Sequence, residues 1–568
     1  MARTITREAP TRRGASARRD RLLRRLLPVL VIAAIALLIG VIVGAGHVPA
    51  ERKVAEQFAQ DWDRGDYGSM YDLISDGAKR RVTALQFASA YRAAAATATA
   101  TATRTGKVPD PDGGVVRLPL AVRTRVWGTL PGVIRLPFSG DGDDARVEWR
   151  PNLVFPGLDA GQHLTRSTAL GRRGNILARN GQALVSGPGR VVGFPAASGL
   201  AGDMGRPGPI QRHELRALGF PPDARVGTSG LELALNQQLA GVPGGILRAG
   251  GTTIARSTPR AGQNVRTTID PSAQKAAVAA LGNRLGGAAA IKPDGQVLAL
   301  AGIAASDVQP PGSTFKMITL TAVLEAGAAK PSTVFPYQTD THLSGVRLEN
   351  ANGESCGGTL VQSFANSCNS VFAPLGAKVG AQKLVSTAER YGFNQPPDIP
   401  GFTESTLPQA NKVGDDLAVG STAIGQGDVE ATTVQMAVVA ATIANRGLRP
   451  RLRVELDSRP SYTRVTSPRV ARTVGKMMVA VVRSGTGTAA AIPGVTVAGK
   501  TGTAELGNTV DQSGNKNANA PDTDAWFAAF APVRKPRIAV GVLLVQAGAG
   551  ADVGAPTAHD LLTSTLQD

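Results

Sequence analysis

The chain is organised around Pro310-Pro311-Gly312-Ser313-Thr314-Phe315-Lys316, which runs into Met317-Ile318-Thr319-Leu320-Thr321-Ala322-Val323-Leu324. Because a Pro-Pro-Gly turn cannot be helical and the next residues are apolar on nearly every side, the pattern predicts a buried helix that begins near Ser313. Lys316 then lies one turn along on the same face, close enough to share a proton with the serine hydroxyl. An apolar surround would lower the pKa of Lys316. The segment therefore predicts a nucleophile and its base.

A second Ser-x-x-Lys sequence, Ser272-Ala273-Gln274-Lys275, shows that this spacing alone is a weak signal. It follows Asp270-Pro271 at the start of an Ala-rich helix of mixed polarity, so we expect its serine and lysine to face water.

Two further motifs follow Ser313 in order. Ser367-Cys368-Asn369 supplies a second hydroxyl and an amide, and Lys500-Thr501-Gly502-Thr503 supplies a second cation on a strand-like run from Val495 to Leu506. Serine with lysine, then S-x-N, then K-T-G is the three-part signature of penicillin-recognising serine acyl-transferases. The chain therefore resembles the class B penicillin-binding proteins, and the resemblance implies a transpeptidase domain with a serine β-lactamase-like fold.

The resemblance extends to the surroundings of the motifs and covers residues 262–568. Gly287 to Gly302 resembles the paired strands that precede the nucleophile helix. Gly425-Gln426-Gly427 with Gln435-Met436-Ala437 resembles another recurrent stretch of the family. Asp524 to Pro532 and Arg537 to Val545 look like the next two strands of the same sheet.

The net charge of +19 is concentrated near the start of the chain. Residues 1–25 contain nine Arg against Glu8 and Asp20, so +7 of the total lies in a basic tail. Aromatic residues are sparse and the remaining basic residues form no long run. These features exclude nucleic acid as an expected partner.

Residues 26–46 are 21 residues without a charge, enough to cross a bilayer as one helix. Several Arg precede them, which by the positive-inside rule keeps the N-terminus cytoplasmic and the catalytic domain extracytoplasmic. The alternative is a cleaved signal peptide. Since the apolar run is longer than a usual signal core and no Cys follows it for lipid attachment, we expect an uncleaved single-pass membrane anchor.

Residues 47–156 form the next expected domain. Short amphipathic helices come first, with strand-like material from Val115 onward. This order resembles the NTF2-like α+β domain that some penicillin-binding proteins carry beside the membrane, with Val147 to Pro156 as its closing strand. The Ala/Thr repeat between Ala93 and Thr105 is interpreted as a helix end or a flexible loop.

Residues 157–261 are rich in Gly and Pro. Gly171 to Gly181 resembles the R-G-x-I-x-D-R-N-G run of class B proteins, with Ala178 where an acid is usual. Gly227 to Glu232 and Leu239 to Gly244 resemble its later G-L-E and G-x-P-G elements. By this resemblance the segment builds an extended pedestal or dimerisation-like domain. The chain as a whole is thus expected to be a multidomain α+β protein.

Two absences narrow the expectation. There is no E-D-x-x-F glycosyltransferase signature, and the 215 residues from 47 to 261 are already assigned, so a class A bifunctional synthase is not expected. The family would instead rely on a separate glycosyltransferase partner of the cell-wall machinery. Five scattered His residues without H-E-x-x-H or a Cys/His cluster give no expected metal or cofactor.

The only cysteines, Cys356 and Cys368, both lie outside the membrane in the expected topology, where disulfides are permitted. Eleven residues separate them, and a bridge would tether a loop to the active-site wall. The alternative is two free thiols, with Cys368 packed as a small apolar residue. We expect the disulfide.

The resemblance also implies roles for the motif residues. The substrate would be a peptidoglycan stem peptide ending in D-Ala-D-Ala, and β-lactams would acylate the same serine. Ser313 would be the nucleophile and Lys316 its base, Ser367 a proton relay, and Asn369 a holder of the substrate amide. The substrate carboxylate would be attracted and oriented by Lys500, Thr501 and Thr503, and Gly502 would leave room for the peptide along the strand.

Three alternatives share some of these features. A class D-like β-lactamase also has S-x-x-K and K-T-G, but it needs only the catalytic domain. A β-lactam sensor needs a cytoplasmic output domain, for which 25 residues are too few. A non-catalytic cell-wall scaffold has no need of the complete set of catalytic residues.

Overall fold

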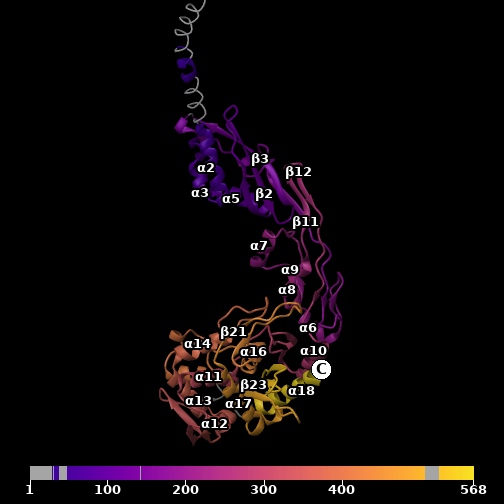
Figure 1. Cartoon of the computed structure of the whole chain (residues 1–568). Helices are drawn as coiled ribbons and strands as arrows, with labels where there is room; N and C mark the ends of the chain where they lie inside the picture. The colour runs from indigo at the N-terminus through magenta and orange to yellow at the C-terminus, as the bar shows by residue number, and fades with distance from the viewer. Residues whose placement is uncertain (1–28, 30, 37–47, 141, 506–522, 568) are drawn as a thin grey trace, which may run out of the picture. The chain divides into compact units, whose positions relative to one another are not determined.

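The computed structural model describes residues 29, 31–36, 48–140, 142–505 and 523–567 (Figure 1). The basic tail at 1–25 and most of the expected anchor at 26–46 lie outside these residues, although residues 29 and 31–36 are helical. Among the residues described, no helix combines the length and the apolar character needed to cross a membrane. Packing divides the chain into two compact units: Met1–Thr168 with Ala217–Gly219 and Gly245–Ser257, and Ala169–Arg216 with Phe220–Gly244 and Thr258–Asp568.

The first unit places helices before an antiparallel sheet, in the predicted order. Its helices are α2 (Ala50–Arg64), α3 (Tyr67–Asp72), α4 (Asp76–Lys79) and α5 (Ala84–Thr97). Its sheet has the order β1-β2-β3-β4, from β1 (Ala100–Thr105), β2 (Val115–Thr124), β3 (Gly128–Ser139) and β4 (Arg146–Val147). Thr83 and Gln86 form a capping box that fixes the start of α5. Buried aromatic residues, including Phe87, Tyr91 and Trp149, fill the core.

Two local predictions in this unit were wrong in part. The Ala/Thr repeat is a helix end, as predicted, only as far as Thr97; residues 100–105 are not a flexible loop but form β1, which pairs with β2. Alternating β-branched threonines suit a pleated strand. The expected closing strand from Val147 to Pro156 pairs only at its start, since Pro151 opens a 3-10 turn, Pro151–Val154. A proline lacks the N–H that a sheet needs but is tolerated at a helix start.

The first unit also contains most of a three-stranded sheet of order β12-β11-β5, from β5 (Leu164–Ala169), β11 (Gly244–Ala249) and β12 (Thr252–Ser257). Leu247 and Ala249 are fully buried in the same core as the helices. The indole Nε1 of Trp127 donates to the carbonyl of Gly245 at 3.0 Å. Chain segments far apart in sequence therefore complete this unit.

The second unit begins with a small sheet of order β13-β6-β7-β8, from β6 (Ile176–Leu177), β7 (Ala183–Ser186), β8 (Val191–Val192) and β13 (Val265–Arg266). Glu232, in α8 (Gly230–Ala234), is 1% exposed and pairs with both Arg173 and Arg190. The two family-like elements that contain Arg173 and Glu232 are therefore joined by a buried ion pair. Ala178 is fully buried, and its backbone closes a turn with Gln182 and Gly181.

The centre of the second unit is a five-stranded antiparallel sheet of order β15-β14-β24-β23-β22. Its strands are β14 (Gly286–Ile291), β15 (Val297–Gly302), β22 (Ala498–Glu505), β23 (Thr523–Ala531) and β24 (Ile538–Leu544). These strands confirm the ones expected from the sequence. Because β22 stands at the edge of the sheet, its outer side has no strand partner within the described part of the chain.

Buried residues alternate between the two faces of this sheet, as a strand period of two requires. On one face Phe527 and Val540 pack with α10 (Pro271–Leu281) and α18 (Ala555–Gln567), which lie side by side (Figure 1). On the other face Trp526 and Leu543 pack with the larger helical layer.

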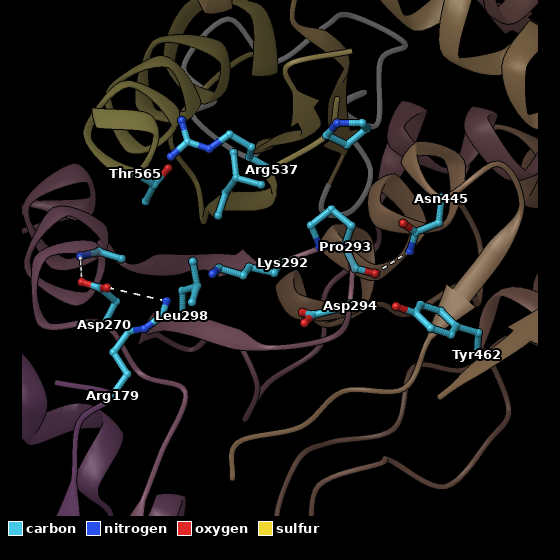
Figure 2. Close-up of a pocket in the computed structure, with 13 residues that line it drawn as sticks. Arg179, Asp270, Lys292, Pro293, Asp294, Leu298, Asn445, Tyr462, Arg537 and Thr565 are labelled. Atoms are coloured by element: carbon cyan, nitrogen blue, oxygen red, sulfur yellow. Dashed lines mark hydrogen bonds and ion pairs between the residues drawn. The ribbon is translucent and has the colours of Figure 1, made fainter. Parts of the chain in front are cut away.

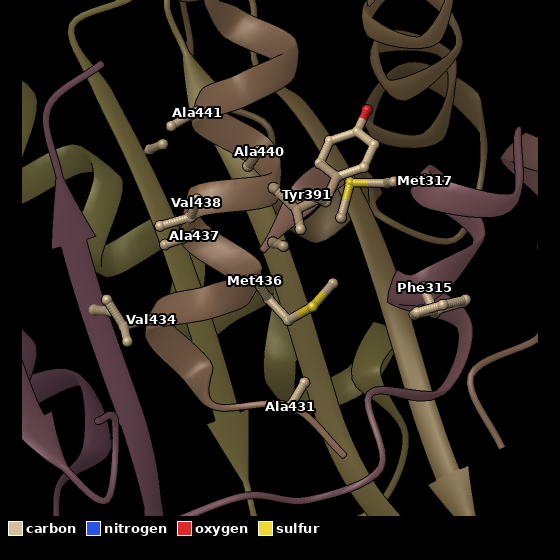
Figure 3. Close-up of a cluster of buried hydrophobic side chains, with 14 of the residues drawn as sticks. Phe315, Met317, Tyr391, Ala431, Val434, Met436, Ala437, Val438, Ala440 and Ala441 are labelled. Carbon is tan, nitrogen blue, oxygen red and sulfur yellow. The ribbon is translucent and has the colours of Figure 1, made fainter. Parts of the chain in front are cut away.

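The larger layer contains α11 (Lys316–Ala326), α12 (Leu360–Ala365), α13 (Asn369–Val379), α14 (Ala381–Tyr391), α15 (Asp416–Ala423), α16 (Thr433–Ala444) and α17 (Pro468–Ser484). Figure 3 shows α16 crossing the sheet, with Met436 extending toward the segment that carries Phe315. Helix α16 lies so close to the sheet that a Cβ on Gly541 would stand 2.2 Å from the carbonyl oxygen of Thr433. This close approach fixes the helical layer, which includes α11, against the sheet.

Candidate functional site

Ser313 lies in a short turn that is anchored on both sides. The turn is a 3-10 helix, Gly312–Phe315, and α11 itself begins at Lys316, so the predicted helix start is about one turn early. Gly312 has φ +50°, and a Cβ there would meet the carbonyl oxygen of Thr503 at 2.5 Å. The Gly312 N–H donates to the carbonyl of Gly425 at 2.9 Å. The turn that carries Ser313 is therefore packed between β22 and the loop at Gly425.

Lys316 is fully buried at the start of α11. Its Nζ donates to the carbonyl of Ser367 at 2.6 Å, to Oδ1 of Asn369 at 2.6 Å and to the Ser367 hydroxyl at 3.3 Å. Burial, and then the positive charge of Lys500, hold the pKa of Lys316 well below its usual range. A neutral amine at this position is the form that accepts a proton.

The Ser313 side chain is half-buried, and its hydroxyl has no hydrogen-bond partner among the residues described, Lys316 included. No hydrogen bond therefore joins Ser313 to Lys316 in the structure, and their sharing of a proton stays a prediction. The hydroxyl is left available, and the lysine is bound to the S-x-N motif.

Ser367 is held in an uncommon backbone conformation between α12 and α13. Its φ is +62°, in the left-handed region, which costs a residue with a Cβ about 1–2 kcal/mol. Cys368 follows it and forms a disulfide with Cys356, whose Cα is 5.5 Å away. The carbonyl and hydroxyl of Ser367 both point to Lys316, so the strained conformation serves the lysine contacts.

Lys500, in β22, is also fully buried. Its Nζ donates to the Ser367 hydroxyl at 2.9 Å and to the carbonyl of Thr501 at 3.0 Å. It lies 5.7 Å from the centroid of the Phe364 ring. Burial lowers the pKa of Lys500 to about 7. The S-x-N serine thus lies between the lysines of the other two motifs.

The other residues of the K-T-G-T motif contact the protein around them. The hydroxyl of Thr501 hydrogen-bonds that of Thr486, and the hydroxyl of Thr503 accepts the Gly550 N–H at 3.1 Å. A Cβ on Gly502 would lie 2.8 Å from the carbonyl oxygen of Pro311, inside the protein. Packing against the nucleophile turn therefore requires a glycine at position 502, and the predicted room for a peptide along the strand stays a prediction.

Sequence reasoning missed several residues that organise the site. Asn350 is 4% exposed; its Oδ1 accepts the Ser370 N–H at 2.8 Å, and its Nδ2 donates to the carbonyls of Gln338 and Glu354. Thr486 is the partner of Thr501. The Gly-Thr repeat after α17 is a turn signal that could have drawn attention to Thr486, whereas nothing in the sequence distinguishes Asn350.

The second Ser-x-x-Lys sequence lies elsewhere, at the start of α10. Asp270 caps this helix through the N–H groups of Ser272 and Ala273, and both Ser272 and Lys275 are exposed, as predicted. The Lys275 ammonium lies 5.7 Å from the ring centroid of Phe194. The geometry therefore brings only the Ser313 copy together with the other two motifs.

A serine on a tight turn, two buried lysines and a hydroxyl between them, all beside the free edge of an antiparallel sheet, define a class of serine acyl-transfer folds. The family model for the penicillin binding protein transpeptidase domain matches residues 259–563, and the model for the NTF2-like N-terminal transpeptidase domain matches residues 50–162. The chain belongs to the penicillin-binding protein transpeptidase family.

Known proteins of this family align with about half of the chain. The chain is 39% identical over 290 residues to the peptidoglycan D,D-transpeptidase PbpA of Mycolicibacterium smegmatis, covering 47% of this chain and 56% of that protein. The chain thus spans about half the length of the curated relatives that it matches.

Two solved structures match a larger share of the chain. The penicillin G acyl-enzyme complex of penicillin-binding protein A from Mycobacterium tuberculosis matches with TM-score 0.56 and 28% identity, covering 70% of this chain and all (100%) of that one. The D,D-transpeptidase domain of a peptidoglycan glycosyltransferase from Eggerthella lenta matches with TM-score 0.56 and 29% identity, covering 70% and 99%.

Proposed function

We propose that this chain is a peptidoglycan D,D-transpeptidase that works through an acyl-enzyme on Ser313 and is inhibited covalently by β-lactams. The observation that carries the proposal is the position of Lys316, which is fully buried and bonded to both Ser367 and Asn369 of the S-x-N motif. The D,D-transpeptidase activity of PbpA and the penicillin G adduct of a matched structure support the same reaction.

In the first half-reaction, neutral Lys316 takes the proton of the Ser313 hydroxyl, and the serine oxygen attacks the carbonyl of the penultimate D-Ala. The backbone N–H groups of Ser313 and Thr503 hold the oxyanion. When the C–N bond breaks, the proton passes by way of Ser367 to the leaving amine of the terminal D-Ala. An ester on Ser313 remains.

In the second half-reaction, an amine of a neighbouring stem peptide attacks this ester. The new amide bond forms the cross-link, and the Ser313 oxygen recovers a proton from the attacking amine through Lys316. Asn369 would hold the substrate amide. Lys500, with Thr501 and Thr503, would bind the terminal carboxylate at the free edge of β22.

The proposal is tested by labelling the full chain, in detergent, with a fluorescent penicillin. A Ser313→Ala variant is labelled in parallel, and the adduct is followed for hours. A stable label that is lost in the variant supports an acyl-transferase shielded from water. Rapid loss of the label would indicate a class D-like hydrolase instead, and absence of label in both proteins would indicate a scaffold or a site that resists β-lactams.

A direct assay separates the last two outcomes. A transpeptidase offered a stem pentapeptide and a free D-amino acid releases D-Ala and incorporates the added amino acid at the same position. A scaffold releases none.

We further propose a domain organisation in which a basic tail (1–25) and a membrane anchor (26–46) precede an NTF2-like domain (47–156), a pedestal (157–261) and the transpeptidase domain (262–568). The support is the uncharged run of residues 26–46 and the Arg residues before it. Carbonate extraction of membranes should leave the full chain in the pellet, and a protease added outside intact spheroplasts should remove the catalytic domain. The glycosyltransferase partner that this arrangement needs would be sought by cross-linking in those membranes.

A further inference from the structure

A second pocket lies in the same unit as the proposed active site but at the other end of its sheet. The cavity has a volume of about 650 Å³ and is lined by residues from the β14–β15 and β23–β24 turns, α10 and α18. Ile538, which lines the pocket, is the first residue of β24, and Leu544 is the last. Leu544 pairs with Ala525, which in turn pairs with Thr503 of β22, so Leu544 marks the end of the sheet near Ser313. Six residues along a strand span about 20 Å, so this pocket is separate from Ser313.

Five charged side chains line the pocket. Arg179, Lys292 and Arg537 carry the positive charges, and Asp270 and Asp294 carry the negative ones. Figure 2 shows Lys292 in the middle, with Arg179 and Asp270 on one side and Asp294 on the other.

Both carboxylates already have partners of their own. Asp270 caps α10 through the Ser272 N–H at 2.9 Å and lies 3.8 Å from Arg179. Asp294 accepts from Arg453 at 2.7 Å and from the side chain of Gln296 at 2.8 Å. Their charges are therefore largely neutralised by groups that hold the local fold together.

Two of the three cations, Arg537 and Lys292, are not paired with a carboxylate in the part of the chain that the structure describes. Arg537 donates to the carbonyl of Leu566 at 3.1 Å. The Lys292 ammonium has no hydrogen bond or ion pair to any residue that the structure describes. Burial, and then the charge of Arg179, lower the pKa of Lys292, and the carboxylates of Asp294 and Asp270 oppose this shift only in part.

Lys292 is half-buried without a hydrogen-bond partner among the residues described, so its desolvation is not compensated by a direct contact. An anion placed against Lys292 would supply the missing hydrogen-bond acceptor and the missing charge. The cavity volume is that of pockets that hold ligands of drug size, here one or two sugar or amino-acid units.

We propose that this pocket is a binding site for an oxyanion group, a carboxylate or a phosphate, of a small extracytoplasmic ligand, with Lys292 and Arg537 as its principal contacts. The extracytoplasmic side follows from the topology proposed above. Carboxylates of wall peptides and phosphates of wall polymers are the two sources of this chemistry, and the test distinguishes them.

The test uses the full chain in detergent and three probes: N-acetylmuramyl-L-alanyl-D-isoglutamine for the carboxylate, glycerol 3-phosphate for the phosphate, and neutral N-acetylglucosamine. Binding is measured by calorimetry and by the shift in thermal unfolding. We expect one or both anionic probes, and not the neutral sugar, to raise the unfolding temperature. The probe that binds more tightly identifies the source.

Lys292→Gln should weaken binding of the anionic probe at least about tenfold, since a charge-assisted hydrogen bond is removed. Without a probe, the same variant should unfold at a temperature equal to or above that of the wild type. Lys330→Gln is the matched control, because Lys330 is an exposed lysine outside the pocket. Penicillin labelling of Ser313 should be unchanged in both variants and serves as the check of folding.

Arg537→Gln provides a second route in case Lys292→Gln folds poorly, and it should weaken the same probe. The proposal is overturned if neither anionic probe binds the wild type, or if Lys330→Gln weakens binding as much as Lys292→Gln does. It is equally overturned if both pocket variants bind like the wild type.

Discussion

Lys316 and Lys500, two fully buried lysines from different motifs, approach the same hydroxyl group: their Nζ atoms lie 3.3 and 2.9 Å from Oγ of Ser367. The hydrogen-bond partners that the structure gives to the two ammonium groups are carbonyl, amide and hydroxyl oxygens. Two neighbouring positive charges without a carboxylate cannot both be held easily in a buried site. We therefore expect the pair to titrate as a unit, with Lys316 neutral first.

This pairing predicts a bell-shaped pH profile for acylation of Ser313 by benzylpenicillin. The rate should fall at acid pH, as Lys316 becomes protonated below its depressed pKa. It should also fall as pH rises through the pKa of Lys500, about 7 in the free protein, because the charge that attracts the carboxylate is lost. Stopped-flow measurement of the second-order rate constant checks both limbs.

Lys500→Arg is the control for the alkaline limb, because a guanidinium stays charged throughout this range. If the variant acylates measurably, its alkaline limb should be absent. A wild-type rate that keeps rising from neutral pH to pH of about 10 would contradict the proposed role of the Lys500 charge.

Lys500→Met should abolish acylation and yet make the protein more stable. The folded-state pKa of about 7 lies below the ordinary value of 10.5, so the unfolded chain binds the extra proton between these two values. The charged lysine therefore destabilises the fold most below pH 7, and the effect fades as pH rises toward 10.5. Urea unfolding near neutral pH should show a gain of roughly 2 to 5 kcal/mol.

Lys476→Met supplies the comparison for this stability measurement, since Lys476 is an exposed lysine of α17. It should change the free energy of unfolding by less than about 0.5 kcal/mol. A Lys500→Met protein that is less stable than the wild type would show that the hydrogen bonds of Lys500 outweigh the burial of its charge.

Ser367 should respond differently to glycine and to alanine. Both variants lose the hydroxyl and should acylate slowly, but glycine adopts φ +62° without strain, whereas alanine keeps the strain. We expect Ser367→Gly to unfold within about 1 kcal/mol of the wild type and Ser367→Ala to be about 1 to 3 kcal/mol less stable. Equal stabilities for the two variants, measured by urea unfolding, would show that the left-handed backbone is not what matters.

Much of the catalytic unit could be predicted because its motifs determine the local structure through short-range effects. The Pro-Pro-Gly turn before an apolar run predicts a buried helix, and the strand-like runs from Lys500 onward appear as β22, β23 and β24. The exposed Ser-x-x-Lys sequence at Ser272 could also be distinguished from the one at Ser313, because Asp270 marks an ordinary capped helix start.

The remaining features depend on contacts distant in sequence, which no local pattern reveals. The three-residue spacing suggests that Ser313 and Lys316 interact, but Lys316 instead donates a hydrogen bond to Ser367, 51 residues away in sequence. The packing of Gly502 against Pro311 and the partnership of Thr486 with Thr501 also arise only in the folded chain. The Ala/Thr repeat formed a strand because β2 was available to pair with it.

The disulfide between Cys356 and Cys368 should support acylation indirectly, because Cys368 is bonded in sequence to Ser367 and Asn369, both of which contact Lys316. In Cys356→Ala/Cys368→Ala we expect a loss of about 2 to 3 kcal/mol of stability, since a short cross-linked loop is opened. Acylation by benzylpenicillin should slow at least about tenfold as the Ser367 backbone gains freedom. Treating the wild type with a strong thiol reductant should reproduce both effects. The same treatment should change neither the stability nor the acylation rate of the double variant. An unchanged acylation rate in the reduced wild type, verified by thiol titration, would leave the bridge a stabilising role only.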